Sequence, residues 1–234
     1  MDSYPPEPVC ATWSIAARDA ASGRFGIAVA SCHIAVGAYV PNIRPGVAAV
    51  CTQSWANAAL APRIWAAVAT GDAPGDAVAA ALETDDRPGN RQIAVIDYLG
   101  RTTAYTGVET QAHEPSQWWG HAAGDDYVVA GNTLTGPAVV QSTADRFMAL
   151  RAAGERFEWA LVLALAAGDA AGGDHRGRQA AALLVSSAGP EASEYTPQAD
   201  LRVDDHPAPI VELQRLCGLH LPPRLVTADS DAGA

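Results

Sequence analysis

The sequence predicts an α+β protein in which antiparallel sheets are covered by helices. Three observations support this prediction. Strand patterns come in runs at 12–54 and 91–107, helical patterns come in runs at 61–83 and 136–168, and a strand pair with one helix follows. Elements that are grouped by type are typical of layered α+β proteins, whereas parallel sheets alternate strand and helix.

Three strands come first. "TWSIAARD" (12–19) alternates polar and apolar residues, and "RFGIAVAS" (24–31) is apolar throughout its centre. The "SGR" between them supplies a turn, so the two are expected to pair as a hairpin. "GVAAVCTQS" (46–54) has the pattern of another buried strand.

Two short helices are expected next, at 61–71 and 73–83. Proline is tolerated in the first turn of a helix, and each segment has one there. Gly71 is expected to end the first helix, and Asp72 is the expected N-cap of the second.

A hairpin (91–107) and a strand (126–134) lead to two longer helices, 136–154 and 157–168. The second of these, "FEWALVLALAAG", is nearly all apolar and must be buried. Its apolar surface is larger than one sheet face usually covers, so we expect a homodimer formed through helices.

The last elements are two strands and a helix. "QAAALLVSS" (179–187) and "ADLRVDD" (199–205) are expected to pair, and "APIVELQRLCG" (208–218) is expected to be helical. Asp205 lies just ahead of that helix, where a carboxylate commonly acts as the N-cap.

The elements divide the chain into three parts. Residues 1–11, which contain "PPEP", are expected to be a flexible leader. Residues 12–220 contain no linker or repeat and are expected to form a single domain. The small polar residues of 221–234 are expected to be a flexible tail.

Composition excludes several classes of function. The chain has 15 basic and 26 acidic residues and a formal charge of −11, which repels nucleic acid and anionic membranes. We therefore expect a small-molecule partner, with no nucleic acid and no membrane. Every basic residue is arginine, so Schiff-base chemistry on lysine is excluded.

Cysteine usage favours a reducing compartment. Four dispersed cysteines, at positions 10, 32, 51 and 217, are too few for a disulfide scaffold, and no pair has zinc-finger spacing. Cys32 and Cys51 lie in or beside apolar strands, where an inert cysteine is the usual case. The leader lacks the features of a secretory signal, and no apolar run reaches about 18 residues. We expect a cytoplasmic protein.

Three polar motifs and a tryptophan pair are candidates for catalysis or substrate binding. "GGDHRGRQ" (172–179) is a glycine-rich loop that could hold a substrate carboxylate or form a structural Asp–Arg pair. "QSWAN" (53–57) and "GNTLTG" (131–136) end strands in amide side chains, which could donate to an oxyanion or fix turns. Trp118 and Trp119 could line a pocket, although core aromatics are more usual.

"RVDDHP" (202–207) contains the types of residue that bind metals, and His33, His113 or His121 could complete such a site. Adjacent side chains on a strand point in opposite directions, however, which argues against a shared metal. We expect no metal and no cofactor.

Taken in order, "ATWSIAARD…GIAVASCHIAVGAYVP…GVAAVCTQSWAN", "WGHAAGDDYVVAGNTLTGP", "GGDHRGRQAAALLV" and "DLRVDDHPAPIVEL" resemble the DUF1028 family. The likeness extends over 12–216. The family looks like a branch of the N-terminal nucleophile (Ntn) hydrolases, which implies a four-layer α-β-β-α sandwich of antiparallel sheets. The element order above agrees with that fold.

The resemblance also implies a nucleophile. Family members commonly begin with a "TFSI" strand, and the matching residue is Thr12, which would become the terminal residue once 1–11 were removed. A free α-amino group with a pKa near ~7.7–8.0 can take the proton of the threonine hydroxyl. Inside an intact chain the same nitrogen is an amide and cannot act as a base. Ala11 is small enough to let the hydroxyl reach the preceding carbonyl.

Other roles are assigned by the same match. Ser31 is expected near the terminal amine, Asn132 or the amide of Gly131 in an oxyanion hole, and Asp174 with Arg178 in positioning. The complete set of expected site residues is Thr12, Ser31, Asn132 and Asp174 for catalysis, and Arg178, Asn57 and His33 for substrate binding.

The expected function is therefore hydrolysis of a small non-protein amide or related C–N bond by Thr12. Two alternatives stay open. The first is a non-catalytic Ntn-like domain that binds a small molecule and keeps its leader. The second is a metal-dependent hydrolase built on Asp204, Asp205 and His206.

Overall fold

The computed structural model of the chain describes residues 9–10, 12–112, 117–187 and 197–221. In chain order its elements are β1 (Val9–Cys10), β2 (Thr12–Asp19), β3 (Arg24–Ser31), the 3₁₀ turn η1 (Val36–Ala38), β4 (Pro41–Arg44), β5 (Ala48–Trp55), α1 (Leu60–Ala69), α2 (Pro74–Leu82), the 3₁₀ turn η2 (Pro88–Asn90), β6 (Arg91–Asp97), β7 (Thr102–Thr106), α3 (Val108–Ala112), β8 (Trp118–Gly124), β9 (Tyr127–Leu134), α4 (Ala138–Ala152), α5 (Phe157–Ala170), β10 (Ala180–Val185), β11 (Ala199–Val203) and α6 (Pro209–His220).

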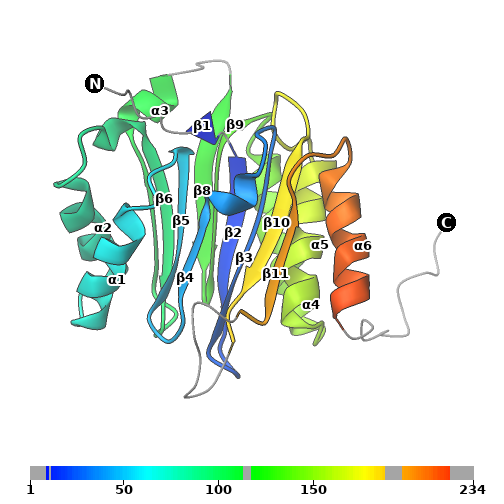
Figure 1. Cartoon of the computed structure of the whole chain (residues 1–234), viewed down its shortest axis with the longest axis horizontal. Coiled ribbons are helices and arrows are strands. Elements are labelled where there is room, and N and C mark those ends of the chain that lie inside the picture. Colours follow the sequence, from blue (N-terminus) through cyan, green and yellow to red (C-terminus); the bar gives the residue numbers. More distant parts are fainter. Residues whose placement is uncertain (1–8, 11, 113–116, 188–196, 222–234) are drawn as a thin grey trace.

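The elements form four layers (Figure 1). Helices α1 and α2 cover a five-stranded sheet, this sheet faces a six-stranded sheet, and α4, α5 and α6 cover the outer side of the second sheet. The strand order is β1-β5-β6-β7, with β4 also beside β5, in the first sheet and β11-β10-β3-β2-β9-β8 in the second. Every strand pair is antiparallel. The expected α+β architecture, a four-layer α-β-β-α sandwich of antiparallel sheets, is confirmed.

The expected β2–β3 hairpin is present, and its strands are antiparallel. Thr12 at the start of β2 pairs with Ser31 at the end of β3, and Asp19 pairs with Arg24 beside the turn. Alternation along β2 directs Trp13 and Ile15 to the core under the helices, and Ala16 to the core between the sheets. Both faces of the strand are covered, which explains why it is almost wholly buried.

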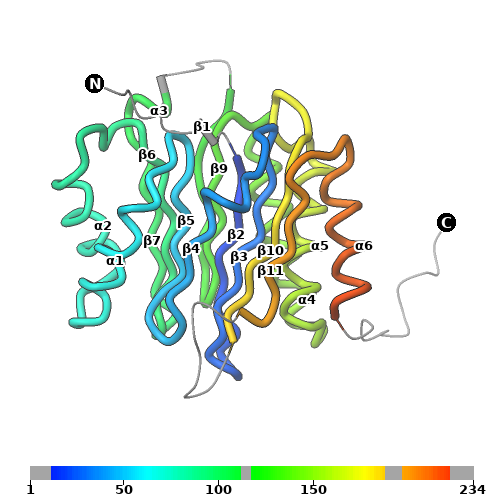
Figure 2. The backbone as a smooth tube through the Cα atoms, in the orientation of Figure 1, coloured from blue at the N-terminus to red at the C-terminus, as the bar shows by residue number. Residues whose placement is uncertain are grey.

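Helix α5 is buried as expected, and the chain itself covers its apolar surface. It packs on β2, β3 and β10, and it lies between α4 and α6 on the outer face of the six-stranded sheet (Figure 2). Leu161 and Leu165 are fully buried there. The apolar surface that predicted a homodimer therefore has an explanation within one chain, and the homodimer stays a prediction.

Several elements were missed by the sequence analysis, among them β4, β8 and α3. β8 is built mainly from glycine, alanine and tryptophan, and β4 contains Pro41 and Asn42, so neither has the β-branched pattern of a strand. Proline at the first position of a short strand is tolerated because no ladder donor is needed there. The five-residue helix α3 is too short for a periodic signal.

The two N-cap predictions were wrong. Helix α2 begins after Ala73 rather than Asp72, and no side chain caps it. Helix α6 begins after Ala208, whose N–H donates to Nδ1 of His206 at 3.0 Å, while Asp205 accepts a hydrogen bond from Gln179. Proline at the start of each helix already removes one of the donors that a cap would satisfy.

The expected tail, 221–234, lies outside the described residues except for Leu221. Of the expected leader, the structure describes only β1. Among the described helices, none is both long enough and apolar enough to cross a membrane.

Gly26 tests the packing of β3 against α5. A Cβ atom at this position would lie 2.4 Å from Cδ1 of Leu161 and 2.8 Å from Cε1 of Phe157, both in the core. We predict that Gly26→Ala lowers the free energy of unfolding by ~1–3 kcal/mol in urea denaturation, because overpacking forces these side chains to shift.

The matched control is Gly75→Ala in α2, where the nearest atom is 3.8 Å away. This change should not lower stability, because alanine favours the helix by ~1 kcal/mol. Equal stability of the two variants would contradict the described packing.

Candidate active site

Six buried polar side chains meet between the sheets at the end where β2 begins. Each is at most 3% exposed, and on its strand each shares a face with residues of the apolar core between the sheets. We call this set the inter-sheet polar cluster. Its members are Thr12, Ser14, Ser31 and Asn132 from the six-stranded sheet, and Gln53 and Gln92 from the five-stranded sheet.

Gln92 is the centre of the cluster. Its Oε1 accepts hydrogen bonds from Nε2 of Gln53 at 2.7 Å and from Nδ2 of Asn132 at 2.8 Å. Its own Nε2 donates to the carbonyl of Gly131 at 2.9 Å and to Oγ1 of Thr106 at 3.0 Å. One side chain therefore joins β6, β5 and β9, and so links the two sheets.

Gln53 extends the network to β2. Its Oε1 accepts a hydrogen bond from Oγ of Ser14 at 2.6 Å. Its Nε2 lies 3.2 Å from the carbonyl of Ala130 and 3.5 Å from the carbonyl of Thr12. The main chain at Thr12 is thus held from the opposite sheet.

The hydroxyl of Thr12 is the exception in this network. Thr12 is 0% exposed, and among the described residues its Oγ1 has no hydrogen-bond partner. A buried hydroxyl without a partner costs ~1–3 kcal/mol, so such groups are rare in structural positions. The hydroxyl therefore lies within the cluster without contributing to its hydrogen-bond network.

Thr12 also lies where the chain changes sheets. β1 pairs with β5 in the five-stranded sheet, β2 belongs to the six-stranded sheet, and only one residue separates them. The start of β2 is therefore at the junction of both sheets and the preceding segment.

Two residues beside the cluster have a left-handed backbone conformation. Ser54 on β5 has φ 67°, and Thr133 on β9 has φ 59°. This conformation is costly for residues with a Cβ, above all for a β-branched residue, and it concentrates at functional sites. Ser54 Oγ lies 3.1 Å from Oγ1 of Thr110, which fixes its side chain.

Asp174 holds the end of β3. Its carboxylate is buried and accepts hydrogen bonds from the N–H of Cys32 at 3.0 Å, from the N–H of Arg176 at 2.9 Å and from the Arg176 guanidinium at 2.8 Å. Because Cys32 follows Ser31, this clamp fixes the strand end next to Thr12. The positioning role expected for Asp174 is compatible with these contacts and stays a prediction.

Arg178 lies near Ser31, on the helix-covered side of the six-stranded sheet. It donates to Asp169 at 2.7 Å, and both residues line a small hollow together with Trp13 and Ser31. Half of its side chain is exposed.

Asn57 and His33 have local partners. Asn57 donates to Asp85 at 2.8 Å and accepts from the N–H of Ala59, at the start of α1. His33 has Nδ1 2.7 Å from the carbonyl of Ile34, and its ring meets Tyr39 edge-on. Neither residue belongs to the inter-sheet polar cluster.

A buried ion pair near the cluster was missed by the sequence analysis. The Arg91 guanidinium lies 2.9 Å from Asp85, and it also donates to the carbonyl of Trp55 at 2.7 Å. Burial raises the pKa of Asp85, but the hydrogen bonds from Arg91 and Asn57 outweigh burial and hold the pKa below the usual aspartate value. The pair anchors the last residue of β5.

Two residues of the alternative metal site, Asp205 and His206, have hydrogen-bond partners elsewhere in the chain. Asp205 bonds Gln179, and His206 bonds the main chain of Ala208. Within the described ranges, no three His, Cys, Asp or Glu side chains come together as a metal site. His113 lies outside the described residues.

The buried cysteines are unsuited to act as nucleophiles. Burial raises the pKa of the Cys51 thiol to about 12, and it does the same for Cys217. A thiol is a weak nucleophile unless it ionises. Cys51 is a buried core residue, and its inertness stays a prediction.

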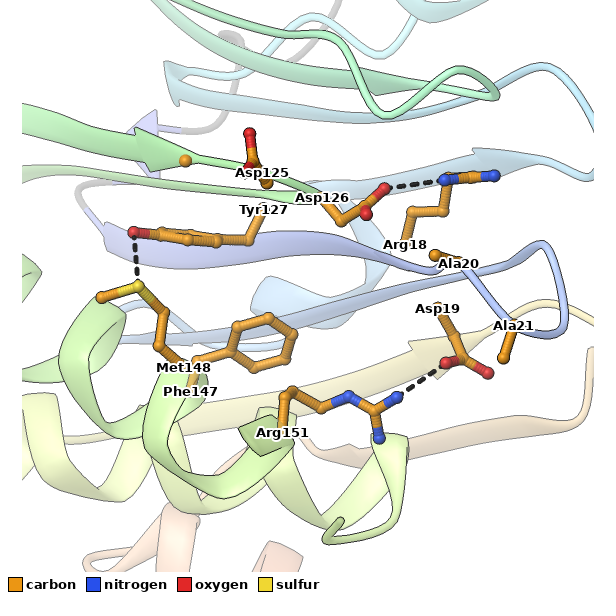
Figure 3. Close-up of a pocket in the computed structure, with 11 residues that line it drawn as sticks. Arg18, Asp19, Ala20, Ala21, Asp125, Asp126, Tyr127, Phe147, Met148 and Arg151 are labelled. Carbon is orange, nitrogen blue, oxygen red and sulfur yellow. Dashed lines mark hydrogen bonds and ion pairs between the residues drawn. The ribbon is translucent and has the colours of Figure 1, made fainter. Parts of the chain in front are cut away.

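A hollow of about 720 Å³ lies at the other end of β2 (Figure 3). Four of the charged residues that line it form two pairs, Arg18 with Asp126 at 2.8 Å and Arg151 with Asp19 at 2.7 Å. Asp19 is seven positions after Thr12 on an extended strand, so the two residues are roughly 23 Å apart. This hollow is therefore distinct from the Thr12 site.

A family model described as "Family of unknown function (DUF1028)" matches residues 12–213. The chain belongs to the DUF1028 family. The match begins at Thr12, so the segment before it is not part of the family pattern. Comparison with curated proteins gives no match.

The solved structures that match this chain include the following two. The DUF1028 protein SPO2555 from Silicibacter pomeroyi is 29% identical, with a TM-score of 0.75 over 88% of this chain and 84% of that one. Anbu (ancestral beta-subunit) from Yersinia bercovieri is 15% identical, with a TM-score of 0.35 over 89% of this chain and 94% of that one. At that score the second likeness carries no argument.

In this DUF1028 chain, the sequence analysis anticipated only some members of the inter-sheet polar cluster. Thr12, Ser31 and Asn132 were expected, and Gln53 was noted as a strand-end amide. Gln92 was missed, although it alternates with Ala94 and Ile96 on the inner face of β6. A polar residue in phase with core residues was the available signal.

Gln92→Leu tests the network directly. Leucine keeps the volume but removes the acceptor of two buried N–H groups, on Gln53 and Asn132. We predict that the free energy of unfolding falls by ~1–3 kcal/mol for each donor left unpaired, as measured in urea.

The control is Gln141→Leu, which removes an exposed amide that bonds Asp145 on α4. It should leave stability nearly unchanged. If Gln92→Leu were as stable as Gln141→Leu, the network would not link the sheets.

Proposed function

We propose that the chain is a hydrolase of an amide or related C–N bond in a small molecule, with Thr12 as its N-terminal nucleophile once residues 1–11 are removed. One observation carries the proposal: the hydroxyl of Thr12 is fully buried and, among the described residues, has no hydrogen-bond partner. The strained residues Ser54 and Thr133 beside it add support.

The chemistry needs only Thr12 and water. Oγ1 attacks the substrate carbonyl, its proton passes to the α-amine of Thr12, and the amine gives a proton to the leaving nitrogen as the C–N bond breaks. Water then attacks the ester on Thr12, and the amine again accepts the proton. The acid product leaves and the hydroxyl is restored.

Removal of the preceding segment uses the same hydroxyl. Attack of Oγ1 on the carbonyl of Ala11 moves the acyl group from nitrogen to oxygen, and water then cleaves the resulting ester. This reaction frees the amine that later acts as the base. The family match that begins at Thr12 is consistent with a mature chain that begins there.

The neighbours of Thr12 suit supporting roles. Ser31 is the cross-strand partner of Thr12, which supports a role for it near the amine. Asn132 uses Nδ2 to bond Gln92, and this bond orients its amide as a donor for the oxyanion. Gly131 lies opposite Trp13 on the adjacent strand, so its main-chain N–H is a second candidate donor.

A second function is favoured by β1. Val9 and Cys10 pair with the end of β5, so this part of the expected leader has a defined place while it is attached. A domain that keeps this segment would bind a small molecule without catalysis, because the nitrogen of Thr12 would remain an amide.

Three variants separate these functions by intact mass and by turnover of amide substrates. Thr12→Ala removes the hydroxyl for both reactions, so it should keep residues 1–11 and show no turnover. Thr12→Ser keeps a hydroxyl and should still be processed, with a rate reduced by about 10–1000-fold.

Cys10→Ala is the control, because Cys10 is the other potential nucleophile near the cleavage point. It should be processed and turn over as the wild type does. A Thr12→Ala chain with wild-type turnover would refute Thr12 as the nucleophile.

A further inference from the structure

The edge of β5 is completed by the segment before Thr12. β6 pairs with one side of β5, and β4 pairs with the other side only over Ala48–Cys51. Beyond that, Val9 pairs with Trp55 and Cys10 with Ser54, antiparallel. Removal of β1 would therefore take this strand pairing away from Ser54–Trp55, and an edge of this kind accepts an extended segment.

This edge is held in place by contacts that do not involve β1. Thr110 fixes the side chain of Ser54, and Arg91 donates to the carbonyl of Trp55. The Arg87 guanidinium lies 5.4 Å from the centre of the Trp55 ring. An edge that is ordered in advance loses little entropy when a strand binds to it.

The position of β1 relative to Thr12 indicates which side of the cleaved bond the β5 edge would contact. Cys10 is two residues before Thr12, so β1 belongs to the acyl side of the bond that the hydroxyl is proposed to attack. A substrate whose acyl group is built like a short peptide can repeat the pairing of Val9 and Cys10.

We propose that Ser54–Trp55 is the acyl-side subsite, and that it binds substrates whose acyl part is a short, extended, peptide-like chain antiparallel to β5. This inference rests on the proposed function for its turnover, but not for its binding. It narrows the substrate to a small amide with at least two main-chain amide groups ahead of the cleaved bond. The leaving amine stays unspecified.

The attached segment must then compete with the substrate. A tether this short gives an effective concentration of about millimolar, so an intact chain should exclude an added peptide at micromolar concentration. Loss of residues 1–11 therefore opens the subsite as well as freeing the amine.

The binding experiment uses full-length Thr12→Ala, in which the segment stays attached whether or not the wild type is processed. Val9→Pro with Cys10→Pro removes both main-chain N–H donors of β1, whereas Val9→Ala with Cys10→Ala keeps them. The probe is a fluorescein-labelled peptide with the sequence of residues 6–11, followed by fluorescence anisotropy.

The peptide should bind the proline variant at least about tenfold more tightly than the alanine variant, because only the proline variant leaves the edge open. N-methylation of its valine and cysteine nitrogens should abolish this binding, since it removes the same donors from the peptide. Equal binding to both variants, absence of binding to the proline variant, or binding that survives N-methylation would overturn the subsite. Far-ultraviolet circular dichroism confirms that the variants are folded.

A turnover experiment tests the substrate class on processed wild-type chain. Acetyl-valyl-cysteinyl-alanyl 4-nitroanilide should be cleaved with a kcat/KM at least about tenfold above that of acetyl-alanyl 4-nitroanilide. Equal values would overturn the peptide-like acyl class. If neither anilide is cleaved but the anisotropy result is as expected, the subsite stands and the proposed hydrolysis fails.

Discussion

A single oxygen atom, Oε1 of Gln92, accepts hydrogen bonds from both sheets at the end where Thr12 lies. The donors are Gln53 on β5 and Asn132 on β9, each at 3% exposure or less. Buried amides of this kind are costly unless all their groups are paired, so the network fixes the separation and register of the sheets there. Elsewhere the sheets meet through apolar residues, which tolerate small shifts. The position of Thr12 depends on this network.

The same constraint explains how one residue can serve both structure and chemistry. The carbonyl of Thr12 is within reach of Gln53, while its hydroxyl is buried without a partner in the part of the chain that the structure describes. A rigid main chain with an unused hydroxyl is suited to a nucleophile, because no existing hydrogen bond must break before attack. The nitrogen is the one group whose chemistry would change if the preceding segment were removed, as we propose.

Much of the fold could be predicted because its strands are local pairs. The β2–β3 hairpin has a turn sequence and two apolar strands, and its pairing was predicted correctly. β8 could not be predicted, because its glycines and alanines have no strand preference and it forms only against β9. Within the site, Thr12, Ser31 and Asn132 were anticipated, whereas Gln92 was not. Its role depends on Asn132 from the other sheet, a contact that no local pattern encodes.

The proposed chemistry requires Thr12 to be a terminal residue. The intact mass of purified wild-type chain, followed over time at neutral pH, tests this requirement. We expect the mass to become that of a chain beginning at Thr12, and amide hydrolysis to rise in proportion to that species. A chain that keeps residues 1–11 throughout, or that hydrolyses amides at full rate before their loss, would contradict it.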